Sequence, residues 1–185
     1  MDTLITSNQF QFNSNTMETK VRNFTTLKHK YHIEHVRDGR TIWEETFENL
    51  VPTVGLNYYL DAALKTGVAS PLFSVGLKGT GAAVVGDTMA VHGNWSEEVP
   101  YSNGTRPPWT SGAISAGTID NSASKAGFNI NATGTIFGAF LVGPSGPGTV
   151  KSGANGTLVG VGDFSQFRIV LSGDTLNVTI SAILQ

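Results

Sequence analysis

The sequence predicts a mainly β protein, an antiparallel β-sandwich or barrel of jelly-roll type with one short helix and an extended N-terminal arm. Over residues 72–185, short runs of β-branched and apolar residues are separated by Gly, Asn, Ser and Thr about every 8–12 residues, which is typical of sandwiches and barrels. A single helical pattern precedes these runs, and residues 1–26 are polar. We therefore expect a polar arm over 1–26 and one β domain over 27–185, made of a hairpin plus helix (27–66) and a β-sandwich (68–185).

The arm over residues 1–26 has too little apolar material to fold alone. Phe10 and Phe12 alternate with polar residues and form a candidate edge strand, so both are candidate partner-binding residues. Two interpretations stay open, a frayed terminus or an arm that becomes ordered on a neighbouring subunit.

The next segment predicts a β-hairpin. Residues 27–37 alternate apolar and polar positions, as a half-buried strand does, and residues 41–47 form the returning strand. Asp38-Gly39 stands between them, a dipeptide favoured in the type I′ turn because both central residues of that turn need a positive φ.

Residues 54–65 predict the helix, with Pro52 and Thr53 before it and Gly67 just past its end. Its apolar residues form one helical face. They are Leu56, Tyr59, Leu60, Ala63 and Leu64.

The rest of the chain predicts short strands and turns. The strands are expected at 72–77, 92–99, 113–119, 126–130, 136–142, 157–161, 167–171 and 175–184. Asp87 and Asp174 share a Gly-Asp-Thr-apolar step, and Gly162-Asp163 is related to it. We interpret these as turns in which the Asp side chain accepts hydrogen bonds from the backbone N–H groups ahead of it.

The loop over residues 101–109 is the best candidate for a contact surface. Tyr, Trp and Arg dominate interface hot spots, and this loop contains all three. The partner-binding candidates are Tyr101, Arg106, Pro107, Pro108 and Trp109. The alternative is a structural loop in which Trp109 covers the end of the sandwich.

The sequence shows no convincing metal-binding set, and we expect neither a metal nor another cofactor. His29 and His35 face one side of their strand and His32 faces the other, so the three histidines cannot meet at one ion. A pairing of a histidine with Glu34 or Glu44 is geometrically possible, but no ligand spacing supports it.

Catalytic motifs are missing as well. Asp87 and His92 can be combined with many serines, yet no Gly-X-Ser-X-Gly elbow is present. Glu97 and Glu98 are neighbours on a predicted strand and point to opposite faces, so they cannot act as an acid/base pair. We therefore expect no enzyme.

Composition limits the class of partner. The formal net charge is −2 without a basic cluster, which argues against nucleic-acid binding. No apolar run approaches 18 residues and no secretory signal is apparent, so we expect no membrane segment. Cysteine is absent, so the fold has no disulfides. Only 14% of residues are charged, against about 25% in an average protein, which suits a subunit that packs against its own copies or a large partner.

An ordered set of motifs runs through residues 30–181. It includes Gly55-Leu56-Asn57-Tyr58-Tyr59-Leu60 and the segments 49–51, 73–79, 86–97, 101–107, 121–126, 130–133, 138–141, 160–165 and 172–176. This set resembles a family of small virion structural proteins of tailed bacteriophages. The resemblance implies a place in a phage particle and no known enzymatic activity.

From the resemblance and the composition we expect a capsid decoration (cement) protein that binds the major capsid protein on the outer surface of the virion. Such a protein is made in the host cytoplasm, and a homotrimer or homodimer is expected because decoration subunits occupy local symmetry axes. The alternatives are a tail or head–tail connector subunit, with the hairpin at 31–47 as an assembly edge, and a receptor- or glycan-binding virion module that uses the aromatic loop.

Overall fold

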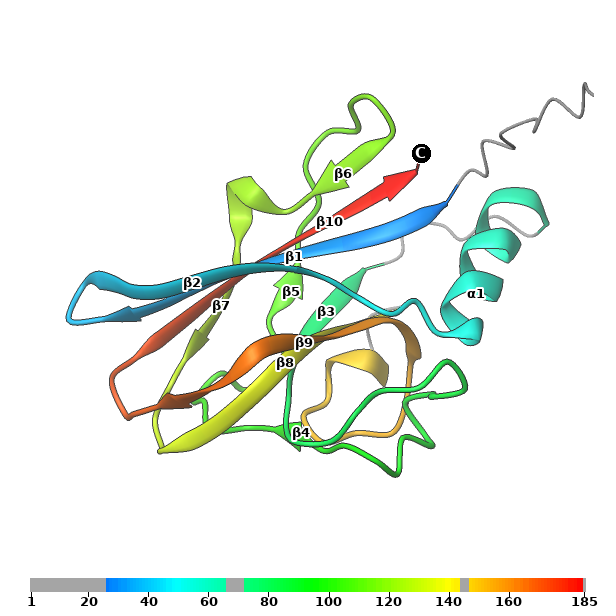
Figure 1. The fold of residues 1–185 in the computed structure, drawn as a ribbon. Helices are drawn as coiled ribbons and strands as arrows, with labels where there is room; N and C mark the ends of the chain where they lie inside the picture. Colours follow the sequence, from blue (N-terminus) through cyan, green and yellow to red (C-terminus); the bar gives the residue numbers. More distant parts are fainter. Residues whose placement is uncertain (1–25, 66–71, 144–146, 185) are drawn as a thin grey trace, which may run out of the picture.

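The computed structural model describes residues 26–65, 72–143 and 147–184, and it has the predicted mainly β, antiparallel architecture with one α-helix. Two five-stranded sheets pack face to face (Figure 1). The predicted arm, with Phe10 and Phe12, lies outside the described residues.

The first sheet has the order β2-β1-β10-β6, and β7 also pairs with β10. Its strands are β1 (Leu27–Arg37), β2 (Arg40–Glu48), β6 (Thr118–Asp120), β7 (Ala126–Asn129) and β10 (Thr175–Leu184). The second sheet has the order β4-β3-β8-β9, and β5 also pairs with β3. Its strands are β3 (Phe73–Lys78), β4 (Glu97–Glu98), β5 (Pro108–Trp109), β8 (Gly134–Gly143) and β9 (Thr157–Val170). Two short 3-10 helices lie at Ser122–Ser124 and Pro147–Thr149.

The predicted hairpin forms with its turn at Asp38 and Gly39, whose φ angles are 50° and 71°. Positive φ at both positions confirms the type I′ prediction. The predicted alternation along β1 is also confirmed, because His29, Tyr31 and Ile33 are buried while the residues between them face outward. The C-terminal strand β10 pairs with β1 along its whole length, so the hairpin and the last strand share one sheet.

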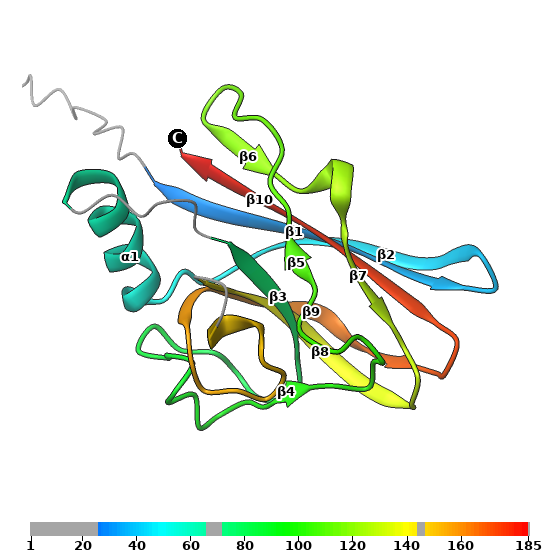
Figure 2. The ribbon, with the colours of Figure 1, turned by 180° about the vertical axis from the view of Figure 1, so that it is seen from behind.

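The core lies between the two sheets and is made of the inward-facing residues of each. The first sheet contributes Tyr31, Ile33, Leu176, Val178 and Ile180, and the second contributes Val75, Leu77, Ile136, Leu141 and Val159. Backbone contacts connect the two sheets at both sides of the sandwich. On one side, Leu50 forms a bridge with Val161 of β9. On the other, which Figure 2 shows, the segment that contains β5 runs beside β6 and β7, where Gly112 donates to the Asp120 carbonyl.

Helix α1 (Thr53–Leu64) lies where predicted, but a different face packs on the sandwich. Gly55 is buried against β9, and a Cβ atom there would stand 2.9 Å from the Val159 Cα. Tyr58 and Tyr59 complete the contact, and the Tyr58 ring packs edge-on against Phe73. Leu56, Leu60 and Leu64 are exposed instead. The packed face therefore follows the glycine, which permits close approach to the sheet, and not the leucines.

Two other expectations are corrected. The strands predicted at 157–161 and 167–171 are one continuous strand, β9, and only short parts of 92–99 and 113–119 are extended. Gly162-Asp163 therefore lies within a strand and forms no turn. Asp87 and Asp174 do stabilise turns, but their carboxylates accept from the N–H groups of Val84 and Leu171, three residues behind and not ahead.

Candidate interaction surface

The loop predicted as a contact surface turns into the protein. Tyr101 and Arg106 are each 1% exposed and Trp109 is 8% exposed, while Pro107 is also buried. Of the predicted residues in this loop, only Pro108 is exposed. The side chains of Tyr101, Arg106 and Trp109 are therefore used inside the sandwich and do not form an exposed surface in this chain.

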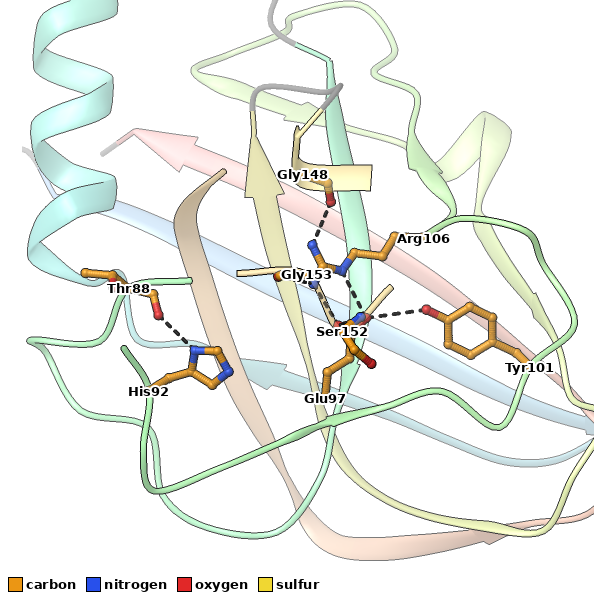
Figure 3. A network of polar contacts seen from close by, with 8 residues as sticks. All are labelled: Thr88, His92, Glu97, Tyr101, Arg106, Gly148, Ser152 and Gly153. Atoms are coloured by element: carbon orange, nitrogen blue, oxygen red, sulfur yellow. Dashed lines mark hydrogen bonds and ion pairs between the residues drawn. The ribbon is translucent and has the colours of Figure 1, made fainter. Parts of the chain in front are cut away.

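Arg106 joins three segments of the chain (Figure 3). Its Nε and one terminal nitrogen donate to the two carboxylate oxygens of Glu97, at 2.9 and 2.7 Å. The same guanidinium donates to the backbone carbonyls of Gly148 and Gly153. The Ser152 N–H donates to Glu97 at 2.7 Å, so the carboxylate also holds the loop after the second 3-10 helix. This largely buried, charge-assisted pair connects β4 to a loop about fifty residues away in sequence.

Trp109, on β5 of the second sheet, contacts strand β10 of the first sheet. Its indole Nε1 donates to the Ile180 carbonyl of β10 at 2.9 Å, and its ring packs edge-on against Phe73 of β3. The indole therefore connects the two sheets, which agrees with the alternative interpretation of the loop as a cover over the end of the sandwich.

A hollow of about 390 Å³ lies beside Arg106 and is lined in part by Met89, His92 and Trp95. The His92 Nδ1 donates to the Thr88 carbonyl at 2.9 Å (Figure 3), while Asp87 accepts from the Trp95 indole. Asp87 and His92 therefore have separate partners and form no catalytic pair. The hollow offers aromatic and apolar walls, and the carboxylate and guanidinium at its floor are already paired with each other.

Two further buried charges connect strands. The Asp174 carboxylate accepts from His35 and, in a two-point contact, from Arg37, each at 2.7 Å. The Arg37 hydrogen bonds hold the pKa of Asp174 well below its usual range. The Lys78 ammonium is fully buried and contacts the Asp163 carboxylate and the Gly81 carbonyl. Each of these groups has a structural partner.

The His29 side chain is buried and neutral. Its Nδ1 accepts from the Asn49 amide at 3.2 Å, so its Nε2 carries the proton and donates to the Tyr59 hydroxyl at 2.9 Å. The backbone N–H of His29 donates to the other end of the Asn49 amide, which fixes the orientation of that amide. Burial lowers the pKa of His29 to about 4.

The exposed surface between β2 and β9 is the strongest candidate for contact with another molecule. Ile42 is 51% exposed, Phe167 is 52% exposed and Ile169 is 55% exposed, and all three line one hollow of about 320 Å³. Trp43 and Arg168 line it too, with the guanidinium 3.9 Å from the indole ring centre. We call these five residues the β2/β9 patch.

The β2/β9 patch also contains an unsatisfied polar group. The Arg168 Nε is buried and has no hydrogen-bond partner among residues 26–65, 72–143 and 147–184. A buried donor without an acceptor costs about 1–3 kcal/mol. The sequence analysis missed this patch, because β9 was predicted as two separate strands and its distance from β2 is set by the fold.

Comparisons with protein-family models, with curated proteins and with solved structures gave no match to this chain. Within the described part of the chain, no helix is long and apolar enough to cross a membrane.

Proposed function

We propose that this chain is a non-enzymatic structural subunit of a tailed-bacteriophage particle, and that it decorates and stabilises the outer surface of the major capsid protein shell. The proposal of a place in a phage particle rests on the ordered motifs that resemble phage virion proteins. The β2/β9 patch is the observation that carries the proposal of a contact function, because large apolar side chains exposed together in one hollow are typical of interaction sites.

The pairing of three buried or half-buried ionisable groups among the described residues supports a structural role. Glu97, Asp174 and Lys78 are the kinds of buried ionisable groups that active sites use, and each is held here by charge-assisted bonds to other elements. These bonds connect segments that are distant in sequence, so we expect a sandwich that changes little when it binds. A rigid subunit loses little conformational entropy when it binds, which suits a protein that reinforces a shell.

The chemistry of the patch defines the partner surface. A guanidinium stacked on Trp43 beside three apolar side chains fits a capsid surface that offers an apolar side chain next to a carboxylate. Arg37 also lines the hollow but is paired with Asp174, so Arg168 supplies the positive charge that favours a partner of negative charge.

The test is binding of the purified protein to preformed shells of the phage that encodes it, measured by co-sedimentation and cryo-electron microscopy. We expect regular density on the outer surface. The double substitution Phe167→Ser with Ile169→Ser should weaken binding about tenfold or more, since it removes half-exposed apolar surface from the contact. Ile114→Ser is the control, because Ile114 is exposed but does not line the hollow, and this variant should bind normally.

Two outcomes would replace the proposal. Density in the neck or tail would favour the connector alternative, in which the edge strand β2 of the hairpin pairs with a neighbouring subunit. Failure to bind any part of the particle would refute the virion role. The glycan-binding alternative has lost its main support, because the aromatic residues Tyr101 and Trp109 are buried.

A further inference from the structure

The outer face of the hairpin brings one histidine and two glutamates together. In the β1–β2 register, Glu34 lies directly across from Glu44, and His32 lies across from Thr46. The His32 Nε2 is 3.7 Å from a Glu34 carboxylate oxygen and 3.9 Å from a Glu44 carboxylate oxygen. The three ligand atoms all lie within 4.8 Å of one another.

The two separations from His32 are close to those of a metal site. Bonds of about 2.0–2.1 Å in a tetrahedral arrangement place ligand atoms roughly 3.3–3.5 Å apart. The observed His32-to-glutamate distances exceed this range by only a few tenths of an ångström. Glu44 has a side chain that is 63% exposed, so a small rotation about its side-chain bonds brings its carboxylate into range.

The imidazole is already oriented for binding. Its Nδ1 lies 2.9 Å from the Thr46 hydroxyl oxygen, which accepts a hydrogen bond when Nδ1 carries the proton. In that tautomer Nε2 carries no proton, and it is the ring nitrogen that lies 3.7 and 3.9 Å from the two carboxylates. Metal-binding histidines in proteins commonly have their second ring nitrogen held in this way.

The local charge favours a cation. Two carboxylates that face each other directly across two strands repel, which destabilises the pair. Lys125 relieves part of this repulsion, since its ammonium contacts both oxygens of Glu34 at 2.8 and 2.9 Å. Among the described residues, Glu44 lies within ion-pair distance of His32. With a neutral imidazole the cluster keeps one negative charge.

We infer that His32, Glu34 and Glu44 form a surface binding site for a divalent first-row transition metal ion, with Zn²⁺ as the preferred ion. One imidazole and two carboxylates fill three positions of a tetrahedral site and leave the fourth open to water. Ca²⁺ and Mg²⁺ are disfavoured, because both ions prefer all-oxygen sites with six or more ligands. This inference replaces the expectation from sequence that no metal binds.

Isothermal titration of the tag-free full chain with ZnCl2 tests the site, and the visible spectrum of the Co²⁺-loaded protein reports the geometry. We expect one Zn²⁺ per chain and a tetrahedral Co²⁺ spectrum. His32→Ala and Glu44→Gln should each weaken Zn²⁺ binding by about tenfold or more. Glu48→Gln is the matched control on the same strand, since Glu48 is exposed and lies outside the cluster; it should bind like the wild type.

Lys125→Met separates a metal site from a merely structural ion pair. Loss of the competing ammonium should strengthen Zn²⁺ binding several-fold, whereas a purely structural Lys125 would leave Zn²⁺ binding unchanged. Absence of Zn²⁺ binding by the wild type, or equal binding by the wild type and His32→Ala, would overturn the inference. Circular dichroism of each variant checks that the exposed substitutions leave the fold intact.

Discussion

The buried His29 predicts a specific loss of stability in mild acid. Its pKa falls from 6.5 to about 4 on folding, because burial disfavours the charged ring. Protonation of Nδ1 would also set two donors against each other, since the Asn49 amide already donates to this nitrogen. Between these two pH values the unfolded chain therefore binds a proton at His29 that the folded chain does not bind.

This difference in bound protons sets the sign and the size of the change in unfolding free energy. Stability falls as pH falls wherever the unfolded state binds more protons, at about 1.4 kcal/mol per pH unit for one site. The His29 contribution begins below pH 6.5 and is complete near pH 4. It amounts to about 2 kcal/mol of unfolding free energy at pH 5 and about 3 kcal/mol at pH 4.

The assay is urea unfolding of the wild type and His29→Gln from pH 7 to pH 4. At pH 7 we expect the variant to be less stable, because the imidazole hydrogen bonds to Asn49 and Tyr59 are lost or weakened. The stability gap between the two proteins should shrink by about 3 kcal/mol toward pH 4. Other titrating groups are common to both chains and cancel. A gap that stays constant over the pH range would refute the reasoning. His32→Gln, on the exposed face of the same strand, tests whether the position of His29 is what matters.

Three further changes test the packing. Arg106→Met should destabilise the fold by about 3–5 kcal/mol in urea, since it leaves a carboxylate buried without its partner. Gly55→Ala should lower the melting temperature, because a Cβ atom would stand 2.9 Å from the Val159 backbone, whereas Gly86→Ala has open space around the new methyl group and should melt like the wild type. Gly39→Ala should cost about 1 kcal/mol, because its φ of 71° is strained for any residue with a Cβ atom.

One result would contradict each of these three expectations. A stable Arg106→Met variant would mean that the buried pair contributes little beyond its own desolvation cost. Equal melting of the Gly55 and Gly86 variants would show that the helix shifts freely on the sheet. An unchanged Gly39→Ala variant would show that the turn relaxes without loss.

Local patterns predicted the elements that depend on neighbours in sequence. The alternation along 27–37 identified the buried face of β1, and Asp38-Gly39 identified the turn, because period and turn chemistry are properties of a few adjacent residues. The helix was found from its spacing, but its packed face was not. The leucines of that helix indicated one face, while the glycine that allows close contact selected another.

Whether the 101–109 loop is exposed or buried depends on contacts with residues that are distant in sequence. Arg and Trp are common both at interfaces and in buried structural networks, so composition alone does not separate the two roles. Arg106 is buried because the carbonyls of Gly148 and Gly153 happen to converge on it. The pairing of Glu34 with Glu44 likewise follows from the strand register, which only the folded hairpin displays.

The pairing of β1 with β10 has a consequence for the order in which the protein can mature during synthesis. Val36 pairs with Thr175 and Leu27 pairs with Leu184, so the strand at the middle of the first sheet leaves the ribosome long after the hairpin that it completes. Until then, the edge of β1 that pairs with β10 has no partner, so its backbone N–H and C=O groups stay open. Such late, long-range closure slows folding and exposes apolar edges to neighbouring nascent chains. A chain that stalls before β10 is therefore expected to aggregate, and slower translation would lengthen the time during which the hairpin needs protection.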